Sequence, residues 1–295
     1  MLLTQANLQA LMTTLRGDFK TAYDSAESWH QRVSMTVPSS TSNNTYGWLS
    51  QLPAVREWVG PRVVHNIESF GYTIVNKLWE HTVGVNRDHI EDDNIGLYTP
   101  LAAAQGEACK EHPDELMLSV IESNPLCFDG QNFFDTDHPI DSNDSGSATY
   151  SNSLSLALTA ANLNTAIDTM TNFRGPSGRR LGKGRLTLMV PTALRSTAAL
   201  IVSAERLANG ASNTDLNVVD LFVNDDLTDA TRWYLMYLGK SIKPFVHQTR
   251  RPWSFVAKDK IGDELVLVDN QFRLYADARY NVGVTLPFLA LRSKP

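Results

Sequence analysis

The sequence predicts an α+β protein, and three observations support that class. Residues 4–26 and 160–173 carry apolar side chains at spacings of three and four, which is typical of amphipathic helices. Residues 96–123 also read as helical. From residue 217 to the C-terminus, by contrast, strand-like segments follow one another. Helices and strands are therefore segregated rather than alternating, as in α+β folds.

The first helix is expected over residues 4–26, with Thr4 as its N-cap. Its apolar face consists of Leu8, Leu11, Leu15, Phe19 and Tyr23. A polar tract, 38–45, follows it and reads as a loop. The helix either packs on the core of its own chain or forms a terminal arm that packs on a neighbouring one.

Residues 46–93 change in character, because three of the six tryptophans, Trp48, Trp58 and Trp79, lie there. Apolar and polar residues alternate and many are β-branched, which predicts a long hairpin or meander. A lone hairpin is marginally stable in water. The stretch therefore needs a partner surface, from its own domain or from another subunit.

The next helix is expected to begin at Thr99 as N-cap, with Pro100 at its first position. Pro113 either kinks this helix or opens a second one. Further along, residues 185–191 read as a buried strand, and a helix is expected from Pro191 to about Leu207.

Composition excludes several functional classes. The net charge is −6 and the isoelectric point is about 5.6, which argues against a protein that binds nucleic acid through its phosphate groups. Two cysteines make no disulfide framework, so a reducing compartment is expected. No signal peptide is recognisable, and the apolar runs are far shorter than the roughly 20 residues of a membrane span. We expect a soluble protein made in a cytoplasm.

The stretch "FFDTDHP", 133–139, gathers residue types that metal hydrolases use: Asp135, Asp137 and His138. A metal site needs three or four converging ligands, but neighbours on a strand point to opposite faces. No His-x-x-x-His or Cys-x-x-Cys accompanies them. Aspartate and proline are also common in turns. A structural turn is favoured, and a metal-dependent hydrolase stays as the alternative.

Two further charged stretches carry no specific motif. The basic, glycine-rich "RGPSGRRLGKG", 174–184, lacks the spacing of a phosphate-binding loop and precedes a strand instead of following one. It is expected to be a flexible solvated loop, with contact to an anion or an acidic partner as the minority option. The acidic "HIEDD", 89–93, is expected to be a solvated turn before the helix or a partner for a basic residue on a neighbour.

Several long stretches, in order along the chain, resemble the major head subunit of Mu-like phages and prophages, the gpT family. They are "MLLTQANLQALMTTLRGDFKTAY", "YGWLSQLPAVREWVG", "TVGVNRDHIEDDNIGLYTPL", "HPDELMLSVI", "CFDGQNFFDTDHP" and "ARYNVGVTLPFLALRS". The resemblance implies a Hong Kong 97-type phage capsid fold. It also implies the division that follows: an N-terminal arm (1–45), an extended β loop (46–93), a peripheral domain with a spine helix (94–150), a mostly axial domain (151–256) and return strands of the peripheral domain (257–295).

The function implied by this resemblance is that of a non-enzymatic capsid subunit, which self-assembles into pentamers and hexamers of an icosahedral shell around double-stranded DNA. The DNA would be enclosed without sequence-specific binding, and no membrane, metal, cofactor or catalytic residue is implied. The implied location is the virion, assembled in the cytoplasm of a bacterial host. A scaffold or protease, a portal and possible decoration proteins are the implied partners. The scaffold would be a separate protein, because the family match starts at the first residues.

Two alternatives remain beside that function: an encapsulin-like cellular compartment on the same fold, and the hydrolase centred on Asp135, Asp137 and His138. Aromatic residues and arginine dominate interface energies. On this ground Trp58, Arg62, Tyr72 and Trp79 are expected to contact neighbouring subunits. The apolar face of the N-terminal arm adds Leu8, Leu11, Leu15 and Phe19. Any of these tryptophans could equally pack inside its own chain.

Overall fold

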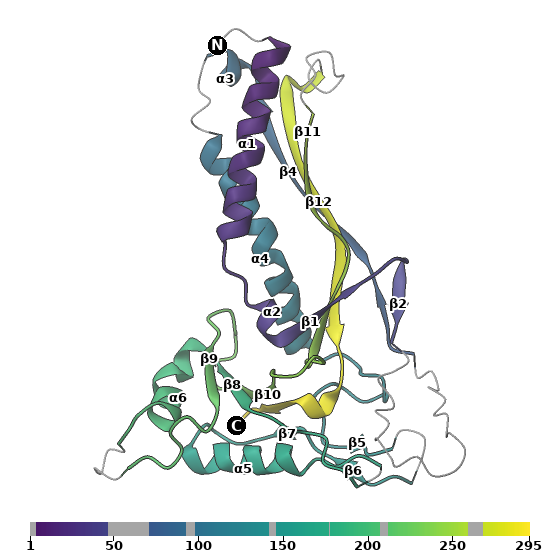
Figure 1. The fold of residues 1–295 in the computed structure, drawn as a ribbon, viewed down its shortest axis with the longest axis vertical. Helices are drawn as coiled ribbons and strands as arrows, with labels where there is room; N and C mark the ends of the chain where they lie inside the picture. The colour runs from purple at the N-terminus through teal and green to yellow at the C-terminus, as the bar shows by residue number, and fades with distance from the viewer. Residues whose placement is uncertain are drawn as a thin grey trace, which may run out of the picture.

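The computed structural model describes residues 4–46, 71–92, 98–141, 146–176, 178–206, 212–258 and 268–295. Figure 1 shows two regions. Two long helices and a four-stranded sheet form a tall structure, here called the wall. A broader region around a five-stranded sheet, here called the body, lies at its foot.

The helices of the wall are α1 (Gln5–Ser25) and α4 (Thr99–Ser123). Thr4 caps α1 as expected, because its hydroxyl accepts a hydrogen bond from the Asn7 N–H at 3.2 Å. Helix α4 runs through Pro113 as one helix, and its N-cap is Tyr98 rather than the expected Thr99. The two helices approach closely at Gly106, where a Cβ atom would lie 2.4 Å from the carbonyl oxygen of Phe19.

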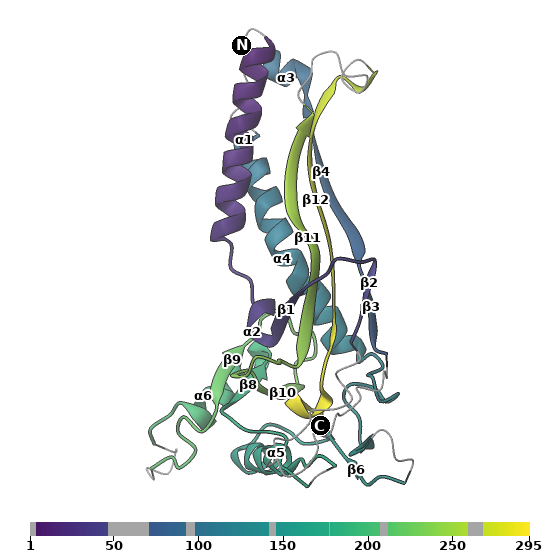
Figure 2. The same ribbon diagram turned by 45° about the vertical axis from the view of Figure 1, so that its right-hand side comes forward.

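The sheet of the wall has the strand order β1-β11-β12-β4. Its strands are β1 (Ser34–Pro38), β11 (Phe245–Lys258), β12 (Gln271–Val284) and β4 (Lys77–Asn86). Strand β12 is antiparallel to both β11 and β4, whereas β1 is parallel to β11. Figure 2 shows α1 and α4 on one side of this sheet. Every second residue of β12 is accordingly buried.

The body is built on a sheet of order β7-β13-β10-β8-β9. Its strands are β7 (Ser153–Leu154), β13 (Ala290–Ser293), β10 (Trp233–Tyr237), β8 (Leu186–Val190) and β9 (Asp220–Val223). The helices of the body are α5 (Ala160–Asn172) and α6 (Arg195–Val202), with short 3-10 turns η3 (Thr192–Leu194) and η4 (Pro287–Leu289). All five residues of β10 are buried, so both faces of this sheet are covered.

Short elements complete the chain. They are α2 (His30–Val33), α3 (Arg87–Glu91), the antiparallel pair β2 (Asn43–Thr45) and β3 (Thr73–Val75), and the antiparallel pair β5 (His138–Pro139) and β6 (Thr149–Tyr150). Within the described residues, no helix is long and apolar enough to cross a membrane.

Three strands lie elsewhere than the expected segmentation places them. Residues 77–86, expected within the extended β loop 46–93 that needed a partner from its own domain or another subunit, pair with β12 over their whole length. Strand β11, grouped with 151–256, lies in the wall, and β13, grouped with 257–295, lies in the body. Alternation along a strand indicates which residues face a core, but it does not identify the partner strand. The helix expected from Pro191 to Leu207 is also shorter, because α6 ends at Val202.

Candidate functional site

The loop "FFDTDHP" does not assemble a site. The side chain of His138 is buried, with Nδ1 2.7 Å from Oδ2 of Asp129, and its ring stacks on that of Tyr150 with centroids 5.3 Å apart. Asp137 is exposed, whereas the backbone N–H of Asp135 donates to the Asn152 side chain at 2.8 Å. Asp137 therefore faces solvent while His138 faces the core.

The same loop is anchored by apolar residues, since Phe133 and Phe134 are buried in the core beside it. Among the residues that the structure describes, no group of three or more His, Cys, Asp or Glu side chains could hold a metal ion. The geometry fits the expected structural turn and gives the hydrolase alternative no ligand set.

The expected contact residues of the first helix face inward. Leu8, Leu11, Leu15 and Phe19 are all buried, and Leu8 and Leu15 have no exposed surface. They pack among buried residues of α4 and of the wall sheet, such as Phe272. Of the two interpretations of this helix, packing on its own chain is the one that the structure favours. Contact of these residues with a neighbouring copy stays a prediction.

Trp79 and Tyr72 also contact their own chain. Trp79 donates its indole N–H to the carbonyl oxygen of Tyr280 at 3.0 Å, and its ring lies 4.4 Å from that of His112. The hydroxyl of Tyr72 accepts a hydrogen bond from the Val284 N–H at 3.2 Å, and burial raises its pKa. Trp58 and Arg62 lie outside the described residues. Contacts of all four with another subunit stay predictions.

A buried polar cluster at the foot of the wall was not expected from the sequence. Oδ1 of Asp114 lies 2.8 Å from Nδ1 of His30, and Oδ2 accepts the Trp29 N–H at 3.0 Å. The hydroxyl of Ser28 and the backbone N–H of His30 also donate to Oδ1, each at 2.8 Å. Burial alone would raise the pKa of Asp114, but these hydrogen bonds outweigh it and lower that pKa.

The cluster extends to the sheet. The ring of His247 on β11 lies 4.9 Å from that of His30, and burial, followed by repulsion from His30, lowers the pKa of His247 to about 4. Further up α4, Nδ1 of His112 lies 2.6 Å from the hydroxyl oxygen of Tyr280, and burial lowers the pKa of His112. These contacts join α2, α4, β11 and β12. In sequence the histidines are isolated, so no local motif indicates the cluster.

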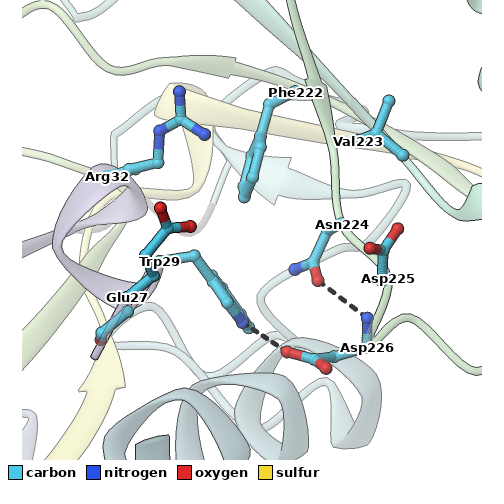
Figure 3. A pocket seen from close by; sticks show the side chains of 9 residues that line it. Glu27, Trp29, Arg32, Phe222, Val223, Asn224, Asp225 and Asp226 are labelled. Atoms are coloured by element: carbon cyan, nitrogen blue, oxygen red, sulfur yellow. Dashed lines mark hydrogen bonds between the residues drawn. The ribbon is translucent and has the colours of Figure 1, made fainter. Parts of the chain in front are cut away.

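A groove of about 650 Å³ lies where β9 faces α2. Trp29 and Phe222 lie next to each other in its lining, with ring centroids 6.3 Å apart, and the indole N–H of Trp29 donates to Asp226 (Figure 3). The groove is lined by Glu27, Ser28, Trp29, Arg32 and residues 222–226. The guanidinium carbon of Arg32 lies 4.6 Å from the centre of the Phe222 ring, a cation–π contact.

The described residues of the basic segment 174–184 form a hairpin closed by one β-bridge, and the flexibility expected for this loop stays a prediction. Arg174 and Arg180 form an isolated β-bridge, and the Gly175 N–H donates to the Arg179 carbonyl at 2.9 Å. Gly178 and Gly184 have φ of 72° and 124°, which favour glycine. Arg179 and Arg180 are exposed, and the guanidinium of Arg174 donates to the Gly178 carbonyl oxygen at 2.9 Å.

Both thiols are buried and free. Burial raises the pKa of Cys109 to about 12 and also raises that of Cys127, whose Sγ lies 3.4 Å from the Thr285 carbonyl oxygen. A thiol with a raised pKa is a poor nucleophile, so neither cysteine suits catalysis.

The architecture is that of a phage major capsid protein. The chain matches a chain of the bacteriophage JBD30 procapsid with a TM-score of 0.65 and 32% identity, covering 99% of this chain and 76% of that one. It matches a chain of the JBD30 capsid decorated with minor capsid protein trimers with a TM-score of 0.56 and 32% identity, over 68% and 90% of the two chains. The expected α+β, Hong Kong 97-type fold is confirmed.

The model of the Mu-like prophage major head subunit gpT family matches residues 8–157, 154–227 and 223–295, and the chain belongs to this family. It is 31% identical to the major capsid protein of Escherichia phage Mu, over 96% of this chain and 72% of that protein. It is 30% identical to the Mu-like prophage FluMu major head subunit of Haemophilus influenzae, over 94% and 69%. Its function is that of a major capsid subunit, and its place is the virion capsid.

A virus-like particle from Pyrococcus furiosus shares the fold, with a TM-score of 0.51, but its identity of 11% supports no statement about function. The cellular-compartment alternative therefore gains nothing from this match, and the family assignment does not favour it.

Proposed function

We propose that copies of this chain assemble into pentamers and hexamers that close an icosahedral shell around double-stranded phage DNA. The observation that carries the proposal is the likeness to the JBD30 procapsid chain, because it covers 99% of this chain and thus includes both the wall and the body. On this proposal the chain acts only by assembling and has no enzymatic activity.

The strand placements support a division of the chain into capsid domains. Helix α4 would be the spine helix of a peripheral domain that also contains strands β4, β11 and β12 of the wall sheet. The five-stranded sheet of the body, with α5 and α6, would form the axial domain. Residues 1–45 would form the arm and residues 46–76 the extended loop, with β4 assigned to the peripheral domain because it pairs with β12.

The charge of the chain supports enclosure of DNA without tight binding. A net charge of −6 disfavours association with a polyanion, since attraction to phosphates needs a basic surface. Proposed partners are a scaffold or protease, a portal and a decorating minor capsid protein. The JBD30 capsid, decorated with trimers of a minor capsid protein, supports the last of these.

The test combines size-exclusion chromatography and electron microscopy on the purified protein, alone and with a co-expressed scaffold of the same phage. Rings of five or six copies, or closed shells, are expected. A stable monomer or small dimer under every condition, with metal found by elemental analysis, would contradict the proposal. That outcome would return attention to Asp135, Asp137 and His138.

A further inference from the structure

One end of the body sheet carries an acidic groove, defined as the hollow lined by Glu27, Trp29, Phe222, Asp225 and Asp226. It lies where β9 ends, because Asp225 follows the last strand residue, Val223, by two positions. Trp29 and Phe222 are aromatic, and three carboxylates lie among them (Figure 3).

Among the described residues, the negative charge of the groove is not balanced by cations. Its carboxylates accept hydrogen bonds, from Thr192 for Asp225 and from Trp29 for Asp226, but these donors are neutral. Among the ion pairs of the described residues, none involves Glu27, Asp225 or Asp226. Arg32 is the single cation among the lining residues, so negative charge remains in excess.

The other end of the same sheet carries the basic hairpin, defined by Arg174, Arg179, Arg180, Lys183 and Arg185, all exposed. Arg185 pairs with Asp220 at 2.7 Å, and the described part of the chain gives the other four no ion pair.

Lys240 adds a further cation close to Lys183 and Arg179 of the hairpin. The ammonium group of Lys240 donates to the Leu181 carbonyl oxygen at 3.3 Å, which holds it against the hairpin. Burial lowers the pKa of Lys240, and repulsion from Lys183 and Arg179 lowers it further. An acidic partner at this end would relieve that repulsion.

The two surfaces cannot meet within one chain. The basic hairpin leads into Leu186, the first residue of β8, and β8 pairs in parallel with β9 up to Val190 and Val223. Five residues of strand, at roughly 3.3 Å each, keep the two ends roughly 15 Å apart. Complementary patches at opposite ends of one rigid element can meet between copies in head-to-tail contact, and a closed ring repeats that contact at every subunit.

We propose that the basic hairpin of one copy binds in the acidic groove of the next copy around each ring of the head. This inference rests on the proposed function, because it requires copies arranged in a ring. Arginine suits the contact, since its planar fork pairs with carboxylates and its face can stack on the Trp29 ring, whereas the Phe222 ring already carries Arg32. Interfaces of this kind owe specificity and association rate to complementary charge.

The test reverses the charges on each surface and then on both. One variant carries Arg179→Glu and Lys183→Glu, and a second carries Glu27→Lys and Asp225→Lys. Asp226 is left unchanged because it holds Trp29. Each variant alone is expected to raise the protein concentration needed for rings or shells by on the order of tenfold or more. The two sets combined are expected to restore assembly towards the unmodified level, because attraction returns with its sign exchanged.

A control reverses an exposed charge outside the acidic groove and the basic hairpin, with Asp168→Lys on α5. It is expected to assemble at the concentration of the unmodified protein. All variants are first checked by urea unfolding, so that loss of assembly is separated from loss of folding.

A second measurement does not depend on charge reversal. Lys183→Cys and Asp225→Cys in one chain place a thiol on each surface, while the native cysteines are buried. Treatment of assembled particles with diamide, a thiol oxidant, is expected to give a ladder of covalently linked copies. Neither single variant is expected to give that ladder.

The outcomes separate the two proposals. If the unmodified protein forms neither rings nor shells, the proposed function fails. If the unmodified protein assembles, and the reversed variants assemble equally well without cross-linking of the cysteine pair, this inference alone is overturned. Shells of normal yield that fail to retain DNA in the hairpin variant would also overturn it, since the hairpin would then contact phosphates. Loss of only the decorating protein in the groove variant would overturn it too.

Discussion

The wall and the body bury their sheets in different ways. In the body, Trp233 to Tyr237 of β10 are buried without exception, so both faces of that sheet are covered. In the wall, β12 buries Phe272, Leu274 and every second residue up to Val282, while the residues between them stay partly exposed. Alternation of this kind is the signature of a sheet covered on one side only.

The comparison shows that the wall keeps a whole face available to its surroundings. That face carries ion pairs between Arg251 and Asp277 and between Arg273 and Asp269. Exposed ion pairs contribute little to stability. The wall therefore depends on one apolar layer under α1 and α4 and on the polar cluster around Asp114, whereas the body has a core on each side of its sheet.

The largest expected effects come from truncating neighbouring residues in each sheet. In β10, both Tyr234→Ala and Leu235→Ala should cost roughly 2–5 kcal/mol, because both side chains are fully buried. In β12, Leu274→Ala should cost a similar amount, but Tyr275→Ala should cost less than about 1 kcal/mol. Urea unfolding of the unassembled protein at neutral pH measures all four. Equal costs at Leu274 and Tyr275 would show that the second face of the wall is covered.

A second effect concerns pH and the foot of the wall. His247 has a pKa of about 4 in the folded chain against an ordinary 6.5, so the unfolded chain binds its proton more readily. The contribution of His247 to stability is then constant above pH 6.5 and is lost as pH drops from 6.5 to 4, by up to roughly 3 kcal/mol. The lowered pKa of Asp114 adds a further loss at the acid end.

The measurement is the urea midpoint between pH 7.5 and pH 4.5. His247→Gln should flatten its dependence on pH, although the variant starts from lower stability. His81→Gln, at an exposed position on β4, serves as the control and should leave the slope unchanged. A slope that His247→Gln does not alter would mean that other groups cause the acid sensitivity.

A third, smaller effect tests how closely the wall helices pack. Gly106→Ala should cost about 1–3 kcal/mol, because its Cβ would lie 2.4 Å from the Phe19 carbonyl oxygen and would force α1 away from α4. Gly17→Ala is the matched control, since a Cβ there meets nothing within 4 Å. It should stabilise the helix by up to about 1 kcal/mol. Thermal unfolding that ranks the two glycines in the opposite order would exclude the close contact.

The smallest effect compares helix caps in the two regions. Thr4 caps α1 in the wall and Thr159 caps α5 in the body, each accepting a backbone N–H at 3.2 Å. Replacing either with alanine should cost about 1 kcal/mol, whereas serine should retain most of the stability. Hydrogen exchange of the first-turn amides measures both losses locally. Unchanged exchange in the Thr4→Ala variant would indicate that packing alone defines the start of α1.

Local features of the fold could be predicted from the sequence, and long-range ones could not. The spacing of apolar residues locates α1 and α5 closely, because helix periodicity is written into neighbouring residues. The pairing of β4 with β12 joins residues nearly 200 positions apart, for instance Asn86 and Gln271. Neither segment carries a sequence pattern that indicates which strand it pairs with. The pattern of alternation in 46–93 was therefore compatible with a free extension.

The same limit applies to the candidate sites. The excess of positive charge in the basic hairpin is visible in its composition. The acidic groove could not be predicted, because it combines Glu27 with Asp225, which are close only in the folded chain. His30, Asp114 and His247 are likewise distant in sequence. Conversely, Asp135, Asp137 and His138 lie within four positions of the sequence, yet Asp137 is exposed to solvent and His138 is buried. The resemblance to the gpT family supplied the fold and the function that local patterns alone did not.

Each region contains one buried thiol whose reactivity would report when the layer covering it separates. Cys109 packs with Phe19 and Ala276 inside the wall, and Cys127 packs with Phe133 and Met189 at the body. A maleimide can reach either sulfur only when the covering layer separates from it. The order in which the two positions become labelled, followed by mass spectrometry of peptides, thus provides a record of which region loosens first when the shell is stressed.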